Sequence, residues 1–274
     1  MISIEWILVL LLGGIALAAV GAHPKLCNLE LIISLKVGIA SGIISVCVYV
    51  LCNLSLSLPN VISYVFSVII LGLAGVGIIL WRFFRNPERN PPDDADAIVS
   101  PADGEIIYIR RIEKGNVPCA IKGQRNISIF EIAKTDLLGK CDGYIIGICM
   151  SIHDVHVTRS PISGSLIFFN SFSGKTLSPK NWESEIVNPR TSLLFESKNG
   201  KRISVIELGT PYVSKILTYI NEMENVKTGQ RIGKITWGSQ VDVIIPVHDV
   251  EICVHEKQRV VAGQTILAKY VIAE

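Results

Sequence analysis

The feature that most constrains this chain is a run of 45 residues, 37–81, without a single charged side chain. One membrane-spanning helix needs about 20 apolar residues, so the run is long enough for two helices and a connection. The connection is predicted at residues 53–60, NLSLSLPN, whose Asn, Ser and Pro residues are typical of a turn. We expect the first of these helices to begin near Leu31 and the second to run from about Val61 to Trp81.

A further uncharged segment, residues 6–22, would extend roughly 26 Å as a helix, enough to cross a bilayer core. The residues before it include no Lys or Arg, which disfavours a cleaved signal peptide. Residues 1–81 are therefore predicted to be a membrane anchor with three transmembrane helices. An anchor with two helices, in which the first segment only lies on the membrane surface, stays open.

The orientation of the anchor follows from its basic residues. Arg82, Arg85 and Arg89 come directly after the last apolar segment, and basic residues favour the cytoplasmic side. The C-terminal part is thus expected on the cytoplasmic side of the cell membrane. Residues 82–98 contain several prolines and acids, and are predicted to form a juxtamembrane linker to a domain over 99–274.

Charge and cysteine content exclude two classes of protein. The chain has 26 basic and 24 acidic residues, a net charge of +2, which is too balanced for a nucleic-acid-binding protein. Its seven cysteines form no CxxC pair and show no metal-ligand spacing with histidine, so no metal site is expected.

The domain over 99–274 is predicted to be mainly β, a compact barrel-sandwich with a minor helix. Short β-branched runs separated by turns predict strands, and only residues 211–223 have a helical pattern. A glycine precedes an apolar strand in four places, which suits a fold of small strands and tight turns: Gly104, Gly164, Gly229 and Gly263. The predicted strands are 98–112, 120–132, 141–152, 163–169, 191–197, 202–209, 231–238, 241–247 and 265–273.

Three short segments contain residue types found in catalytic sites. Asp103 lies in SPADG, 100–104, and by itself this is an ordinary turn. Residues 236–247, TWGSQVDVIIPV, place a Gly-Ser pair between two predicted strands. Each of these patterns carries little information alone.

The third segment, 150–164, gathers His153, Asp154, His156 and Arg159 within seven residues. If the segment is a strand, alternation puts the two histidines on opposite faces, which disfavours a metal site with both. A histidine flanked by Asp and Arg is a reasonable candidate for acid-base chemistry.

Taken together and in order, these segments resemble the phosphatidylserine decarboxylases, a family of membrane-bound pyruvoyl enzymes. Four motifs after the apolar N-terminal part carry the resemblance: FFRNPER at 83–89, SPADG at 100–104, DVHVTRSPISG at 154–164 and WGSQVDVIIP at 237–246. The chain is most similar to the short subfamily, in which the cleavage site is a bare Gly-Ser before a strand.

The resemblance implies that the chain cuts itself between Gly238 and Ser239, into fragments 1–238 and 239–274. The Ser239 hydroxyl would attack the preceding carbonyl to form an ester, and elimination and hydrolysis would leave a pyruvoyl group. This group would form a Schiff base with phosphatidylserine and accept the electrons released when carbon dioxide leaves, giving phosphatidylethanolamine. No pyridoxal cofactor or metal is implied.

The resemblance also implies roles for Asp103 and His156 as acid-base groups. Longer members of the family have a second histidine where this chain has Arg159, and an arginine cannot act as a general base. Either His156 takes over that task or cleavage depends on strain and positioning. Together with His156, Arg159 is expected to bind the substrate, its guanidinium holding the lipid phosphate or carboxylate.

Several alternatives remain open on the sequence alone. The competing function is a non-enzymatic adaptor, a membrane-anchored barrel-sandwich domain that binds partner proteins. The expected partners are the lipid substrate and the two fragments of the chain itself. The sequence does not distinguish ester from ether lipids, and it leaves the oligomeric state open, a homo-oligomer included.

Overall fold

A computed structural model describes residues 4–22, 31–118, 126–133, 142–174, 177, 184–209, 216–235, 239–246 and 250–271. The chain divides into two compact units. One contains residues 1–85 with 151–153, and the other contains residues 86–150 with 154–274. Each unit is described by itself below.

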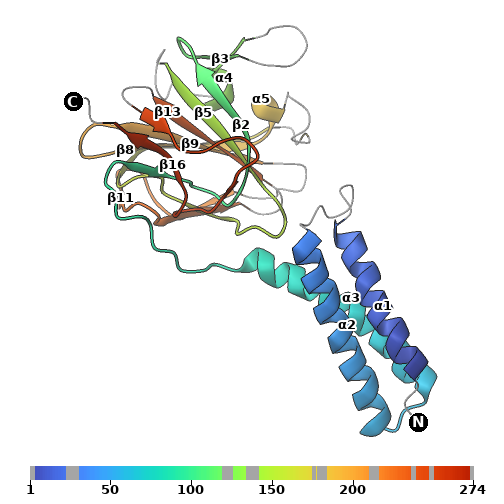
Figure 1. The fold of residues 1–274 in the computed structure, drawn as a ribbon. Helices are drawn as coiled ribbons and strands as arrows, with labels where there is room; N and C mark the ends of the chain where they lie inside the picture. The colour runs from blue at the N-terminus through green and yellow to red at the C-terminus, as the bar shows by residue number, and fades with distance from the viewer. Residues whose placement is uncertain are drawn as a thin grey trace. The chain divides into compact units, whose positions relative to one another are not determined.

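Three helices make up the first unit, α1 (Ile4–Ala22), α2 (Leu31–Leu54) and α3 (Asn60–Phe84), and they lie alongside one another (Figure 1). Each is long and apolar enough to cross a membrane. The start of α2 at Leu31 and the turn before Asn60 agree with the sequence prediction. The last turn of α3 continues to Phe84, three residues beyond the predicted end.

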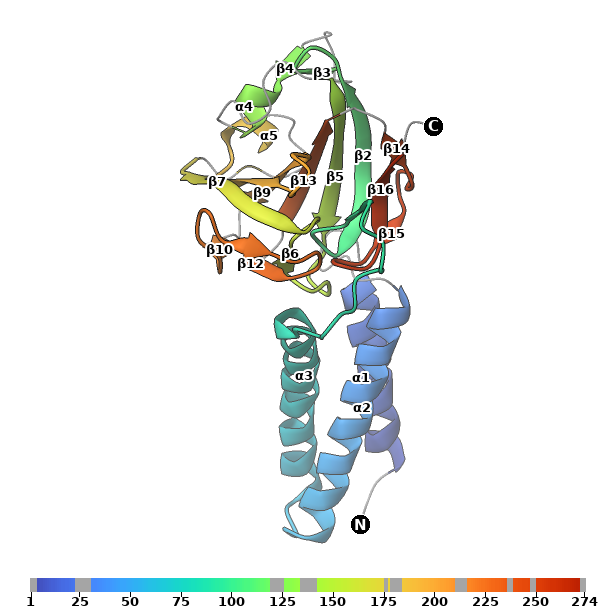
Figure 2. The ribbon, with the colours of Figure 1, turned by 90° about the vertical axis from the view of Figure 1, so that its left-hand side faces the viewer.

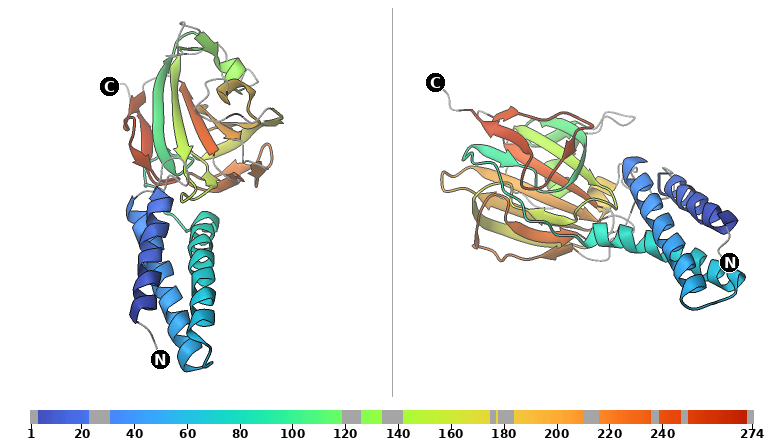
Figure 3. Two further views of the ribbon diagram at one scale, coloured as in Figure 1. Left: turned by 90° about the vertical axis from the view of Figure 1, so that its right-hand side faces the viewer. Right: turned by 60° about the horizontal axis from the view of Figure 1, so that its bottom comes forward.

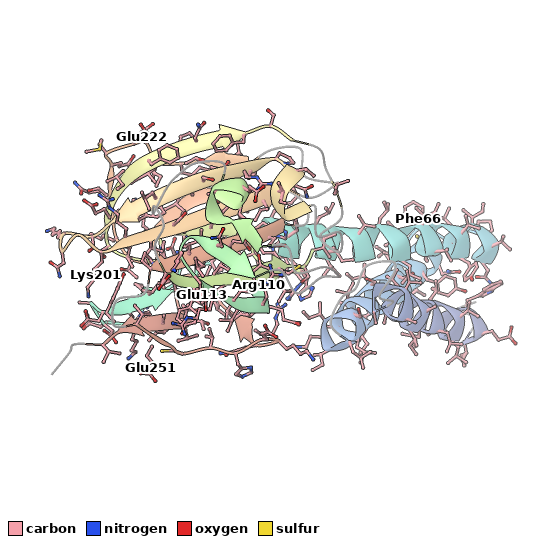
Figure 4. All side chains as sticks on the ribbon, turned by 90° about the horizontal axis from the view of Figure 1, so that it is seen from above. Phe66, Arg110, Glu113, Lys201, Glu222 and Glu251 are labelled. Atoms are coloured by element: carbon pink, nitrogen blue, oxygen red, sulfur yellow. The ribbon has the colours of Figure 1, made fainter. Side chains whose placement is uncertain are left out.

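Small residues allow the helices to approach closely. A side chain at Gly38 of α2 would collide with the backbone of Gly14 and the methyl group of Ala18 on α1, as expected for small-residue packing between membrane helices. Ser45 of α2 donates a hydrogen bond to the carbonyl of Ser67 on α3, at 2.5 Å. Large apolar side chains point outward, among them Phe66 of α3, half of which is exposed (Figure 4). Such an outer surface suits a lipid environment.

The second unit is built around an eight-stranded antiparallel sheet that curls into a half-barrel (Figures 2 and 3). Its strand order is β11 (Asn225–Val226), β7 (Gly164–Phe172), β8 (Arg190–Glu196), β9 (Arg202–Gly209), β13 (Ser239–Pro246), β5 (Gly143–Met150), β2 (Gly104–Ile112) and β15 (Arg259–Val260).

Smaller elements complete this unit. Two three-stranded sheets have the orders β1 (Ala97–Val99), β16 (Ile266–Tyr270), β14 (Val250–Ile252), and β10 (Ile216–Thr218), β12 (Arg231–Ile235), β6 (Val157–Arg159). The remaining described elements are the β3 (Asn116–Pro118) and β4 (Asn126–Ser128) pair and the short helices α4 (Ile129–Ala133) and α5 (Ser184–Val187).

The two faces of the curled sheet contribute to two apolar clusters. The larger cluster joins the inner face, for example Val205 and Val243, to the small sheets through Ile232 and Leu267. A smaller cluster on the other face includes Leu208, Ile244 and, from α4, Ile132. The prediction of a mainly β, barrel-sandwich-like domain behind apolar N-terminal helices is confirmed.

Four local predictions are wrong. The strand predicted over 98–112 is divided by the SPADG turn into β1 and β2. The helix predicted over 211–223 is not formed in its described part, because Ile216–Thr218 pairs with β12 as strand β10; residues 211–215 lie outside the described residues. Within the strand predicted over 120–132, Ile129–Ala133 is helical. The strand predicted over 141–152 ends at Met150, and residues 151–156 form a turn before β6.

Candidate active site

The predicted nucleophile lies at the start of the central strand. Ser239 is the first residue of β13, and its backbone pairs with Gly209 of β9 on one side and Met150 of β5 on the other. Gly238 lies outside the described residues, as does the side chain of Ser239. The Gly-Ser bond therefore directly precedes a strand that is held on both sides.

Two similar Ser-Pro turns frame the site. In SPADG and in SPISG, the serine hydroxyl donates a 2.7 Å hydrogen bond to the carbonyl two residues further on. The carbonyls of Ser100 and Ser160 accept the backbone N–H of Gly263 and Gly229 respectively. Both glycines have positive φ, 73° and 74°, which explains why glycine is required there. The two turns position Asp103 and Arg159.

Asp103 is buried and its carboxylate is engaged on both oxygens. Arg89 forms a two-pronged ion pair with it, at 2.5 and 2.7 Å. The backbone N–H groups of Ala262 and Val155 also donate to it, at 2.8 and 3.3 Å. Arg89 lies in the FFRNPER motif and beside the last apolar segment, and neither position in the sequence predicts this contact.

His156 is fully buried just before β6. Its Nδ1 lies 2.9 Å from the carbonyl oxygen of Asp154, which can only accept, so Nδ1 carries the proton and the lone pair of a neutral ring is on Nε2. Burial lowers the pKa of His156, while its contact with Asp154 and the charges of Asp154 and Asp103 act in the opposite direction. A neutral imidazole can accept a proton.

The same histidine is linked to the chain that leads to the Gly-Ser bond. The carbonyl of His156 accepts the backbone N–H of Ile235 at 3.0 Å. Ile235 ends β12, three residues before Gly238. The β6–β12 pair thus places the segment 150–164, which contains His156, beside the strand that leads into the segment 236–247.

Arg159 is buried and its two terminal nitrogens bind backbone carbonyls. One donates to Gly229 and the other to Pro87, both at 2.8 Å. Burial lowers the pKa of Arg159, as do the positive charges of Arg89 and Arg231, yet a guanidinium stays charged. The role of Arg159 in binding the lipid stays a prediction.

Residues 86–89 of the linker are bound to the β domain by hydrogen bonds and ion pairs. Arg231 donates to Asn86 at 2.8 Å and to Glu88 at 2.6 Å. The carbonyl of Pro87 accepts from Arg159, and Arg89 reaches Asp103. This part of the predicted linker is therefore fixed by arginines and acidic groups of the domain.

Two further buried acids have no role assigned from the sequence, although Asp154 stands in the 150–164 segment. Asp154 forms an ion pair with Arg259 of β15. Glu207 of β9 is fully buried, and burial raises its pKa to about 7. The sequence VIELG offered no signal for Glu207, because one acid in a predicted strand is ordinarily a surface residue. Among the described residues, no group of three His, Cys, Asp or Glu side chains could hold a metal ion.

Comparison with known proteins places this site in a family. The sequence profile of phosphatidylserine decarboxylase matches residues 76–268. The chain belongs to the phosphatidylserine decarboxylase family. This match favours a decarboxylase over the adaptor considered above.

Individual relatives agree with this assignment. A phosphatidylserine decarboxylase proenzyme of Erythrobacter litoralis is 34% identical over 72% of this chain and 75% of the relative. One of Trichlorobacter lovleyi is 33% identical over 68% and 74%. A putative archaetidylserine decarboxylase proenzyme of Methanothermobacter thermautotrophicus is 30% identical over 78% and 95%.

Proposed function

We propose that this chain converts phosphatidylserine to phosphatidylethanolamine and carbon dioxide, using a pyruvoyl group formed from Ser239. The observation that carries the proposal is the position of Ser239 at the head of the central strand, close along the chain to the β6–β12 pair that holds His156. Relatives named proenzymes fit a chain that must process itself before it acts.

The fold supports cleavage between Gly238 and Ser239 without loss of the small fragment. In fragment 239–274, strand β13 pairs with β9 and β5, strand β15 pairs with β2, and β16 pairs with β1. All of these partners belong to fragment 1–238. Cutting the chain before β13 would therefore leave the backbone pairing of both fragments in place.

The described residues suit the chemistry of such a group. A pyruvoyl group supplies a carbonyl that accepts the amine of the substrate and withdraws electrons as carbon dioxide leaves. His156, neutral because burial lowers its pKa, would take up or return a proton at Nε2. Asp103, fixed by Arg89, would favour the protonated form of that imidazole through its charge. Arg159, whose terminal nitrogens bind the carbonyls of Gly229 and Pro87, would attract the anionic head group through its positive charge.

The substrate is a membrane lipid, and the three apolar helices provide an anchor near it. Arg82 and Arg85, at the end of α3, favour a cytoplasmic position for the domain. The proposed location is therefore the cell membrane, with the β domain facing the cytoplasm.

Replacing the nucleophile tests this proposal. Ser239→Ala should remain a single chain of 30.0 kDa and lack decarboxylase activity. Ser165→Ala, which changes a half-buried serine on β7 that donates a hydrogen bond to Asn225, should be cut and active like the wild type. An uncut Ser239→Ala protein that still decarboxylates phosphatidylserine would show that no pyruvoyl group is needed.

A further inference from the structure

Glu207 occupies an unusual place for a carboxylic acid. It lies in β9, pairs with Val241 of β13, and none of its surface is exposed. Two residues further on, Gly209 pairs with Ser239. Residues two apart on a strand share a face, so the backbone register makes positions 207 and 239 diagonal neighbours on the same face of the sheet. Such neighbours have Cβ atoms about 7–8 Å apart, a distance that a long side chain can bridge.

The carboxyl group of Glu207 has little to compensate for its burial: the Thr158 hydroxyl beside it lowers its pKa only in part. Neither of its oxygens has a hydrogen-bond partner in the described part of the chain, and the same is true of the Thr158 hydroxyl. Both side chains lie over Gly233, since a Cβ there would be 3.0 Å from Thr158 Oγ1 and 3.3 Å from Glu207 Oε1. A buried acid without a charged partner is costly to the fold. A leucine or glutamine would avoid the cost of its charge, so the acid calls for a chemical role.

We propose that Glu207 is the proton carrier for self-cleavage at Ser239, an inference that rests on the proposed function. The group is sealed from solvent, which suits a reaction whose reactants both belong to the chain itself.

Every proton that moves in this step can be followed. The O–H bond of Ser239 breaks, its proton passes to the Glu207 carboxylate, and the oxygen bonds to the carbonyl carbon of Gly238. As the C–N bond between Gly238 and Ser239 breaks, the released nitrogen takes the proton back from Glu207. The products are a free amine and an ester that still joins the two parts of the chain, and the Glu207 carboxylate is regenerated. Elimination then removes the α-proton of Ser239 and breaks the C–O bond, which releases Gly238 as a carboxylate, and water converts the remaining enamine to the pyruvoyl group and ammonia.

The surroundings of Glu207 allow it to exchange a proton near neutral pH. Burial raises its pKa to about 7, and the Thr158 hydroxyl opposes this rise only in part. The backbone-paired neighbours Thr191 of β8 and Val241 of β13 carry no charge. The charge of Glu207 acts on the ionisable side chain of Tyr219. Burial is the main cause that raises the pKa of Tyr219, and the charge of Glu207 raises it further.

The positions next to the Glu207 carboxyl group in strands β6 and β12 are Thr158 and Gly233, and neither is charged. Arg231 of β12 pairs with Arg159 of β6 and donates to Asn86 and Glu88. Arg159 follows Thr158 in β6, and Lys234 follows Gly233 in β12. Because successive side chains of a strand point to opposite faces, both should point away from the carboxyl group. His156, two residues before Thr158, has a pKa that burial moves below its usual 6.5. Its titration is therefore expected at lower pH than that of Glu207.

The test follows cleavage of the full chain in time. Newly translated, radiolabelled protein in phospholipid vesicles is shifted to buffers from about pH 5.5 to 8.5, and the two fragments are quantified on a gel. The rate of wild-type cleavage should rise with pH, with a midpoint near pH 7 where Glu207 loses its proton. Glu207→Gln keeps the size of the side chain but cannot carry the proton, so cleavage should slow roughly 100-fold or more and lose this midpoint.

Two further variants keep the proposal open to refutation. Ser204→Ala changes a buried residue of the same strand on the opposite face, and should be cut at the wild-type rate. Glu207→Asp should still cut, with a shifted pH midpoint. Wild-type kinetics in Glu207→Gln would overturn the proposal. If that variant fails to fold, an unchanged midpoint in Glu207→Asp would overturn it instead. A wild-type chain that is never cut would refute the proposed function itself.

Discussion

Arg89→Ala should destabilise the β domain because it breaks a buried ion pair. The side chains of Arg89 and Asp103 are 7% and 8% exposed, and the change removes two hydrogen bonds to the carboxylate and one to the carbonyl of Ala262. Asp103 would stay buried with only two backbone N–H donors.

The size of the effect can be worked out from this geometry. Removing one partner of a buried ion pair typically costs about 3–5 kcal/mol. Because two backbone N–H groups still donate to Asp103, we expect Arg89→Ala to lower the free energy of unfolding by about 3 kcal/mol, the lower end of this range. For a domain of this size, each kcal/mol lowers the melting temperature by about 2–4 °C, so a loss of about 6–12 °C is expected.

The assay uses full-length protein in detergent with Ser239→Ala as background, so that every sample is one uncut chain. Samples are heated, treated with protease and quantified on a gel. Arg231→Ala is the matched control, since its carboxylate partner Glu88 is 85% exposed and such pairs contribute at most about 1 kcal/mol. Equal losses in the two variants, or none in Arg89→Ala, would refute the assigned role of Arg89.

Three further predictions concern the chemistry, the buried acid and the topology. His156→Ala should impair decarboxylation. Arg159→Ala should be cut normally but bind lipid about 10- to 150-fold more weakly, the equivalent of about 1.5–3 kcal/mol. If Arg159→Ala blocks cleavage and leaves lipid binding normal, Arg159 belongs to self-processing instead. Because the folded chain holds the Glu207 proton up to about pH 7 and the unfolded chain releases it near 4.5, the wild type should lose thermal stability as pH rises through that window, and Glu207→Gln should not. A wild-type melting temperature with the same pH dependence as that of Glu207→Gln would contradict this. Protease added to intact cells should spare the β domain, and digestion from outside would reverse the proposed orientation.

Much of the fold could be predicted because its signals are local. Uncharged runs of helical length identify α2 and α3, and VDVIIP, apolar apart from one acid, identifies β13, which lies in the middle of the sheet. The helix expected over 211–223 failed where tertiary pairing decided the outcome. Residues 216–218 could satisfy their backbone groups against β12, and no local pattern reports the presence of that neighbour.

The site was predictable only as a set of motifs. Asp103, His156, Arg159 and Ser239 were found because they stand in recognisable segments. The partner of Asp103 is a linker arginine 14 residues earlier, and a pairing of this kind depends on the path of the chain in space. Glu207 was missed for a related reason: its burial follows from the packing of one sheet on another and leaves no mark in the sequence around it.

The intact mass of the purified wild-type protein tests the central claim most directly. The account predicts two species, residues 1–238 ending in a free carboxylate and a fragment 239–274 that is lighter by one ammonia than the corresponding serine peptide, as a pyruvoyl end requires. A single active species with the mass of the uncut chain, or a small fragment that begins with an intact serine, would contradict it.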